Sequence, residues 1–386
     1  MKFIKKVLRK VKKVLKYLIS LLFYLCPIKK NRITVYNFNG KGYGDNPKYL
    51  IEELRKDKKY EIIWIVSDMS CAFPNDIKKV KYGSLKALYY MTTARLWLDT
   101  IRNNPKPLFK RKNQFYIQMW HGGIVMKGHE ADTIDALSKS YIKAAKKDSK
   151  FADLILSNCK DRTEIIRRAY WYDGEILELG IPRDDVLFFP NKTDVEEFKE
   201  RYGLKDKKIV LYAPSFRNSE NFYTNEQVFD VEKLIKTLNE RFGGDFVFCY
   251  RMHPNDEKRK SQLSKVNGVV DLMKEQDSQF VLSACDVVIS DYSSMWTDFT
   301  LTGRPAFIYA PDYEDFIKNE RMMYFDLKNC MAPFADTFSK LLDNIKNFDY
   351  NKYNNDRAEH YKKCGLFEDG TSSKKIKEYL QDKGII

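Results

Sequence analysis

The first thirty residues of this chain contain no aspartate or glutamate, although they hold ten lysine and arginine residues. The whole chain of 386 residues has a net charge of +15. Two thirds of that charge therefore lie at one end, and the rest of the chain carries only about +5. A charge confined in this way argues against a nucleic-acid-binding body and indicates a local basic surface.

Long apolar runs and regular cysteine spacings are also missing. Mean hydropathy is −0.53, which excludes a polytopic membrane protein, while 44% hydrophobic and 14% aromatic residues exclude a disordered chain. Seven cysteines occur without a CxxC spacing. This pattern favours reduced thiols in a cytosolic protein over a disulfide framework or a zinc site.

Three phosphate-binding or metal-binding motifs are absent from the text. We find no GxxxxGK[ST] loop, no strand followed by GxGxxG and a helix, and no Asp-x-Asp after a strand. A P-loop NTPase and a metal-dependent transferase are therefore not supported. Any phosphate site in this chain is expected to use protein donors alone, with no metal and no cofactor.

Residues 1–30 are predicted to form a basic amphipathic helix, because apolar residues recur at helical spacing and lysines fill the other face. The apolar stretch 17–26 has about half the ~20 residues needed to cross a bilayer. We expect this helix to lie on the anionic cytoplasmic face of the cell membrane as a peripheral anchor. The residues expected to contact lipid are Lys5, Lys6, Arg9, Lys12, Lys13 and Lys16. A cleaved secretory signal and a nucleic-acid arm are the alternatives.

The body of the chain alternates strand-like and helical patterns, which predicts an α/β fold with parallel sheets. Two series of strands are separated by a polar stretch near residue 190. We therefore expect a GT-B-like pair of Rossmann-type, doubly wound domains facing a central cleft, at 31–190 and 191–386, the second including the C-terminal helices. The strands are predicted at 33–38, 61–66, before His121, 152–157, 175–180, 208–214, 245–251, 286–290 and 305–310.

Three predicted strands of the second domain end in side chains that can bind phosphate. Ser293 and Ser294 follow one strand and open a helix, where free backbone N–H groups would add to their hydroxyls. Arg251 and His253 follow a second strand and share one side of an extended chain. Arg217 follows a third. Taken singly, the serines could merely cap the helix, the histidine could be structural, and Arg217 could form a surface ion pair.

His121 stands at the end of a first-domain strand, before two glycines. Its ordinary pKa, near ~6.5, suits a base that takes a proton from a hydroxyl at neutral pH. Gly122 and Gly123 allow the backbone to approach a ligand closely. A buried structural histidine is the alternative. Asp132 or Asp135 is close enough in sequence to orient the ring, whereas His129 and His360 stand in polar text and are expected to be exposed, without a role.

Together these motifs resemble the CDP-glycerol glycerophosphotransferase family, the primases and polymerases of wall teichoic acid and related capsule polymers. The motifs span roughly 37–326 and come in the family's order. The matching segments are GKGYGDNPKYL (40–50), QMWHGG (118–123), ELGIPRDDVLF (178–188), LYAPSFR (211–217), RMHP (251–254), SDYSSMWTDF (290–299) and GRPAFIY with its following aspartate (303–312).

The resemblance implies a GT-B fold that binds CDP-glycerol mainly through its C-terminal domain and needs no metal. It implies transfer of glycerol phosphate to a hydroxyl of a lipid-linked saccharide or growing polymer, with release of CMP. Its catalytic residues would be His121, as the base, and His253. Its substrate-binding residues would be Gly122, Gly123, Arg217, Arg251, Asp291, Ser293, Ser294, Asp298 and Asp312.

Several alternatives stay open at this point. The donor could be CDP-ribitol, or the chain could be a GT-B glycosyltransferase that uses a nucleotide sugar. A non-catalytic membrane or nucleic-acid-binding protein would explain the basic terminus, but it would leave the clustered strand-end residues unexplained. The sequence does not separate a primase from a polymerase, and a homo-oligomer is possible.

Overall fold

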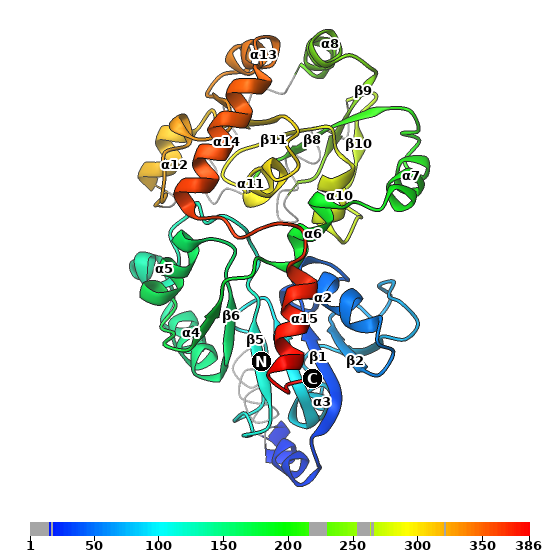
Figure 1. Cartoon of the computed structure of the whole chain (residues 1–386), viewed down its shortest axis with the longest axis vertical. Helices are drawn as coiled ribbons and strands as arrows, with labels where there is room; N and C mark the ends of the chain where they lie inside the picture. Colours follow the sequence, from blue (N-terminus) through cyan, green and yellow to red (C-terminus); the bar gives the residue numbers. More distant parts are fainter. Residues whose placement is uncertain (1–14, 17, 216–229, 253–262, 264–265, 320–321) are drawn as a thin grey trace, which may run out of the picture.

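The computed structural model describes residues 15–16, 18–215, 230–252, 263, 266–319 and 322–386. Two parallel sheets form two α/β domains that lie one above the other in Figure 1. The predicted fold class, a pair of doubly wound domains of GT-B type, is therefore confirmed.

The first sheet has seven strands in the order β3-β2-β1-β4-β5-β6-β7, all parallel. Both of its faces are buried, as parallel sheets require: along β2, Ile62 and Trp64 belong to one apolar cluster, whereas Ile63 and Ile65 belong to another. The strands are β1 (Lys29–Tyr36), β2 (Glu61–Val66), β3 (Lys78–Lys81), β4 (Ala94–Asp99), β5 (Phe115–Gln118), β6 (Leu154–Leu156) and β7 (Glu175–Leu177).

The second sheet repeats the same winding with six strands in the order β10-β9-β8-β11-β12-β13. In both sheets the order reverses beside the first strand, between β1 and β4 and between β8 and β11. Ligands of doubly wound sheets bind at this switch point, at the carboxyl ends of the strands. The strands are β8 (Lys208–Ala213), β9 (Phe246–Tyr250), β10 (Val270–Asp271), β11 (Val287–Ser290), β12 (Ala306–Tyr309) and β13 (Phe334–Ala335).

Helices cover the two sheets and connect their strands. Those up to β7 are η1 (Leu22–Leu25), η2 (Phe38–Gly40), α2 (Asp45–Arg55), α3 (Leu85–Thr93), η3 (Glu130–Ala136), α4 (Lys139–Phe151) and α5 (Lys160–Ala169). Those after β7 are η4 (Pro182–Asp184), α6 (Asp185–Phe188), α7 (Lys192–Arg201), α8 (Val231–Phe242), α10 (Ser278–Ala284), α11 (Ser294–Thr300), α12 (Tyr313–Asn319), η6 (Leu327–Asn329), α13 (Phe338–Lys346), α14 (Tyr350–Cys364) and α15 (Ser372–Asp382).

The sequence predicted that all C-terminal helices belong to the second domain. The last helix, α15, instead packs against the first domain. Figure 1 shows it in red beside α2 and β1. Ile376 and Leu380 are fully buried in the core of the first sheet. The carboxylate of Asp185 accepts hydrogen bonds from the backbone N–H groups of Ser372 and Ser373, both at 2.8 Å, and so caps the helix. The chain therefore passes between the two domains twice, once before β8 and once between α14 and α15.

The N-terminal segment is helical at residues 15–16 and 18–21, and a 3₁₀ turn, η1, follows. Lys29 and Lys30 belong to β1, so the predicted helix over 1–30 is wrong at its C-terminal end: the sheet takes these two lysines as an exposed strand start. Most of the expected lipid-contacting residues, Lys5, Lys6, Arg9, Lys12 and Lys13, lie outside the described residues. Across the described parts of the chain, no helix combines the length and the apolar character that a membrane span requires.

All nine predicted strands are present, with ends shifted by four residues at most. Two strands of the first sheet were missed for identifiable reasons. The sequence of β3, KKVK, offers one apolar residue, and β4 follows α3 without a connecting loop, so no turn signal separates them. The short strands β10 and β13 were also missed.

Candidate functional site

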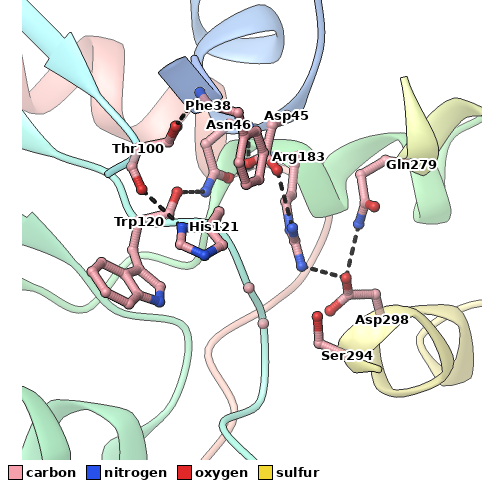
Figure 2. Close-up of polar contacts among 12 residues, drawn as sticks. Phe38, Asp45, Asn46, Thr100, Trp120, His121, Arg183, Gln279, Ser294 and Asp298 are labelled. Carbon is pink, nitrogen blue, oxygen red and sulfur yellow. Dashed lines mark hydrogen bonds and ion pairs between the residues drawn. The ribbon is translucent and has the colours of Figure 1, made fainter. Parts of the chain in front are cut away.

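A cavity of about 580 Å³ lies between the carboxyl edges of the two sheets. It is of the size that small-molecule sites usually have. Its walls include seven of the predicted site residues, which come from three separate motifs: His121, Gly122, Gly123, Arg251, Ser293, Ser294 and Asp298. The structure therefore brings the histidine of the first domain opposite the serines of the second (Figure 2).

The imidazole of His121 is held on three sides. Its Nδ1 lies 2.9 Å from the backbone carbonyl oxygen of Thr100, which follows β4. The indole ring of Trp120 stacks on it at 4.8 Å between centroids, and Phe38 meets it edge-on at 4.9 Å. The backbone of Trp120 has a φ of +57°, in the left-handed region. This conformation turns the chain so that consecutive rings can stack.

The contact with Thr100 fixes the tautomer of the ring. A carbonyl oxygen can only accept a hydrogen bond, so Nδ1 carries the proton and Nε2 keeps a lone pair. Figure 2 shows Nε2 turned away from Thr100. Burial lowers the pKa of His121, although the Thr100 carbonyl opposes this shift. The ring is therefore neutral at neutral pH, and its basic nitrogen Nε2 forms no hydrogen bond with a described residue.

The prediction that Asp132 or Asp135 orients the ring of His121 is wrong, because the backbone carbonyl of Thr100 orients it. The carboxylate of Asp132 pairs with Arg168 at 3.0 Å and accepts a hydrogen bond from the hydroxyl of Tyr324 at 2.7 Å. Asp135 lies on the exposed side of η3. Neither carboxylate has a hydrogen bond to His121 in the described structure.

Two buried side chains hold the loop that carries His121. The amide Nδ2 of Asn46 donates to the carbonyl oxygens of Met119 and Trp120, at 3.2 and 3.1 Å. The guanidinium of Arg162 donates through Nη1 to the carbonyl oxygens of Gly122 and Gly123. These two side chains therefore fix the backbone on both sides of His121.

Arg162 is fully buried, and its Nε and Nη2 have no hydrogen-bond partner in the part of the chain that the structure describes. Burial lowers the pKa of its guanidinium. Sequence reasoning missed it, although a signal was present. Arg162, Ile165, Ile166 and Ala169 lie at helical i, i+3, i+4 and i+7 spacing, which places the arginine on the apolar face of α5.

Gly123 is required by a close approach of the two domains. A Cβ atom at this position would lie 2.2 Å from Oδ1 of Asp298. This carboxylate comes from α11 in the second domain, so the glycine lets the loop pass directly against it. The predicted close approach at Gly123 is therefore real, but in the described structure the approaching group is a carboxylate of the protein.

Arg183 connects the two domains under the cavity. Its guanidinium pairs with Asp298 and lies 3.2 Å from the carboxylate of Asp45. Gln279 donates to Asp298 at 3.0 Å and to Asp184 at 3.2 Å. Burial raises the pKa of Asp298, although the Arg183 charge opposes this shift. Through Oδ2, Asp298 connects the two domains, whereas its Oδ1 is buried with no hydrogen-bond partner among the described residues.

On the second-domain edge, Ser293 and Ser294 follow β11. The hydroxyl of Ser293 accepts a hydrogen bond from the N–H of Met295 at 3.4 Å, so this serine does cap α11. Ser294 Oγ makes no hydrogen bond with a described residue. Arg251 lines the cavity at the end of β9, and its Nη1 donates to the carbonyl oxygens of Leu272 and Glu275 at 2.8 and 2.7 Å. These bonds fix the direction of its guanidinium.

The remaining predicted residues fall in different places. Asp291 is buried and accepts a hydrogen bond from the N–H of Ser215 at 2.8 Å, which holds the ends of β8 and β11 together. Asp312 accepts from the hydroxyl of Tyr292 at 3.0 Å. Neither of these two belongs to the cavity wall. Arg217 and His253 lie outside the described residues.

His129 is half-buried and lines the cavity, so the expectation of an exposed residue was wrong. Its Nδ1 lies 3.2 Å from the hydroxyl of Tyr170, and its ring packs edge-on against Trp120. His360 is also half-buried, edge-on to Phe325. Both histidines stand in polar sequence, which hid the aromatic residues that reach them from other segments.

A buried ionic layer supports the base from the far side of the sheet edge. Asp148 lies 3.1 Å from Arg102, 2.6 Å from Lys106 and 3.0 Å from the amide of Gln118. Gln118 in turn accepts from the N–H of Trp120 at 3.0 Å. This chain of contacts fixes the side chain of Gln118, and its hydrogen bond in turn fixes the backbone of Trp120. Within the described parts of the chain, no three His, Cys, Asp or Glu side chains are grouped to hold a metal ion.

This chain is similar to known proteins of teichoic acid synthesis. A teichoic acid poly(glycerol phosphate) polymerase of Bacillus spizizenii is 29% identical over 396 residues, which covers 97% of this chain and 99% of that protein. A teichoic acid glycerol-phosphate transferase of Staphylococcus aureus is 29% identical, with 95% and 97% covered. A Bacillus subtilis polymerase, 29% identical, is longer, and this chain spans 48% of it.

The solved structure of the wall teichoic acid polymerase TagF has a TM-score of 0.82 and 28% identity, covering 99% of this chain and 97% of that one. A TagF variant soaked with CDPG gives a TM-score of 0.81, with 27% identity and the same shares covered. The family model of CDP-Glycerol:Poly(glycerophosphate) glycerophosphotransferase matches residues 18–382. Because that match takes in nearly the whole chain, the protein belongs to the CDP-glycerol:poly(glycerophosphate) glycerophosphotransferase family.

Proposed function

We propose that this protein transfers glycerol phosphate from CDP-glycerol to a hydroxyl group of a lipid-linked acceptor, with release of CMP, in teichoic acid or related polymer synthesis. The observation that carries this proposal is the Nε2 of His121, unpaired among the described residues, in a cavity whose opposite wall holds Ser294 and Arg251. A neutral base facing hydroxyl and guanidinium groups suits attack of an alcohol on a phosphate.

In the proposed reaction, the acceptor oxygen attacks the β-phosphorus of CDP-glycerol, and His121 Nε2 takes the hydroxyl proton. The bond from that phosphorus to the bridging oxygen breaks, and CMP leaves with the oxygen and its electron pair. Negative charge grows on the leaving phosphate during this step. Arg251, Ser293 and Ser294 stand where they can stabilise it, and we extend the same role to His253.

Protein groups supply the positive charge in this mechanism, and no metal or cofactor takes part. The proposal predicts full activity in excess EDTA, measured as CMP release by protein that has been dialysed against the chelator. Loss of activity that Mg²⁺ restores would contradict this part of the mechanism.

We propose that the protein acts at the cytoplasmic face of the cell membrane, held there by its N-terminal segment. Leu18, Leu22 and Leu25 are 56%, 63% and 85% exposed and lie within eight residues of one another, and exposed apolar residues grouped in this way mark an interaction surface. Leu108 and Phe109 are also exposed, and the Tyr24 ring stacks on Phe109 at 4.0 Å. This apolar tip, together with the basic residues 1–16, suits an anionic bilayer.

The donor is tested by measuring which nucleotide is consumed. Purified protein with a synthetic lipid-linked acceptor is offered CDP-glycerol, CDP-ribitol or a UDP-sugar. Release of CMP from CDP-glycerol, with glycerol phosphate on the acceptor, is the expected result. Consumption of CDP-ribitol alone, or of a UDP-sugar, would overturn the assignment in favour of the corresponding alternative.

The membrane proposal is tested by removing residues 1–25, which leaves β1 intact. Binding to vesicles of phosphatidylglycerol should be lost, whereas binding of CDP-glycerol measured by calorimetry should remain. If the shortened protein still sediments with the vesicles, the anchor lies elsewhere.

A further inference from the structure

The outer surface of α4 carries a row of lysines. Lys139, Lys143, Lys146 and Lys150 are separated by four, three and four residues, so they lie on one face of the helix. All four are exposed. We call these four residues the lysine track; at a rise of 1.5 Å per residue it is about 17 Å long.

No carboxylate of the described residues pairs with the lysine track. None of its members forms an ion pair with a described residue, and Lys146 lies over the ring of Trp171 at 5.4 Å. Asp148 is the one acidic residue of α4, and it is buried against Arg102 and Lys106. The neighbouring helix α5, by contrast, exposes Asp161 and Glu164 among its basic residues.

The two ends of the lysine track lie near features already described. Lys139 follows η3, which begins directly after His129 in the cavity wall. At the other end, Asp153 follows α4 and pairs with Lys110, next to Phe109 and its stacking partner Tyr24. The start of α4 therefore lies towards the cavity wall, and its end is connected to the exposed apolar tip through Asp153 and Lys110. Figure 1 shows α4 on the flank of the first domain, beside α5 and β6.

We propose that the lysine track binds an acceptor that is itself a polyanion, a chain of repeated phosphodiesters that runs from the membrane to His121. The proposal rests on the proposed function and narrows its acceptor from any lipid-linked hydroxyl to a growing polymer. Four flexible ammonium groups at regular spacing bind repeated phosphates without fixing their register. Such loose binding lets a product slide by one unit between transfers.

The test compares two soluble acceptors that carry no lipid: an oligomer of about ten glycerol phosphate units and a single glycerol phosphate unit on the same saccharide. The variant replaces all four lysines (Lys139→Gln, Lys143→Gln, Lys146→Gln, Lys150→Gln), which removes the charge but keeps an unbranched polar side chain and the helix propensity. The matched control replaces four exposed lysines of the second domain: Lys318→Gln, Lys346→Gln, Lys362→Gln and Lys363→Gln.

For the α4 variant, we expect KM for the oligomer to rise roughly tenfold at low salt, with less dependence on salt than in the wild type. Its KM for the short acceptor and for CDP-glycerol should not change. The control should match the wild type throughout, and a variant with four Lys→Arg changes on α4 should retain tight binding of the oligomer.

Each other outcome has a defined meaning. An unchanged KM for the oligomer overturns the proposal, and so does equal loss in the control, which would indicate bulk charge. An unchanged KM together with lost binding to phosphatidylglycerol vesicles would assign α4 to the bilayer instead. If the wild type releases no CMP from CDP-glycerol with either acceptor, the proposed function itself has failed, which is a separate result.

Discussion

The first-domain edge of the cavity holds its base with partners from separate segments, whereas the second-domain edge is built from two short strand ends. Thr100, Asn46 and Arg162 all hold His121 or its loop, and they come from three different connections of the first sheet. On the second-domain edge, Ser294 Oγ makes no hydrogen bond with a described residue.

The difference matches the two tasks of a phosphate transfer. A base has to be held in one position and one tautomer before the substrate binds. The polar groups around it therefore form hydrogen bonds within the protein. The other edge has to meet charge that develops on a ligand, so its donors stay available. The comparison predicts that changes on the first edge lower turnover, whereas changes at the junction between the edges lower stability.

The largest effect is expected from His121→Asn, because an amide cannot take the acceptor proton. Turnover should fall by roughly 10²- to 10⁴-fold, with the affinity for CDP-glycerol retained. CMP release at saturating acceptor and calorimetric titration of the donor measure the two quantities. His360→Asn, next to Phe325 in the second domain, is the matched control and should be as active as the wild type. A rate within a few-fold of wild type for the His121 variant would remove the base assignment.

The second-largest effect is expected from Arg183→Met, at the junction between the two edges. The change leaves the buried carboxylates of Asp298 and Asp45 without their cation, which should cost about 3–5 kcal/mol of unfolding free energy. Urea unfolding followed by tryptophan fluorescence measures this loss. Arg201→Met is the control: Arg201 is exposed and pairs with Glu275 at 3.7 Å, so it should cost less than about 1 kcal/mol. Equal losses in both variants would mean that Arg183 does not hold the domains together.

A smaller effect is expected from Gly123→Ala, which tests how tightly the two edges meet. The new methyl group would lie 2.2 Å from Oδ1 of Asp298, so one edge has to move. We expect a loss of about 1–3 kcal/mol in stability and lower turnover. The double change Gly123→Ala with Asp298→Ala makes room and should recover more stability than the two single changes predict by addition. Simple additivity would show that the two groups do not collide.

The two edges also differ in what the sequence reveals. The second edge consists of two short segments, each directly after a strand, so the turn after β11 and the arginine after β9 were found directly. The parallel order of the strands then predicted that they lie together. The partners of His121 are scattered. A hydrogen bond to a backbone carbonyl, such as that of Thr100, cannot be recognised from the residue type. For this reason nearby carboxylates were expected to orient the ring of His121. Asn46 stood inside a recognised motif, but its link to Trp120 depends on how α2 packs.

The smallest effect tests whether the buried charge of Arg162 acts on the base it supports. His121 works only when neutral, so activity falls as pH drops through its pKa. Burial lowers that pKa, and the acidic limb of kcat/KM should therefore lie below the ordinary value of about 6.5. Asp45 raises the pKa, while Arg183 and Arg162 lower it further.

In Arg162→Met the acidic limb should move to higher pH, by less than about one unit. The plateau of kcat/KM should be lower, because the loop that carries His121 loses its hydrogen-bond donor. Arg167→Met, on the exposed side of the same helix, should leave the limb in place. A lower plateau without a shifted limb would show that Arg162 holds the loop but does not tune the base.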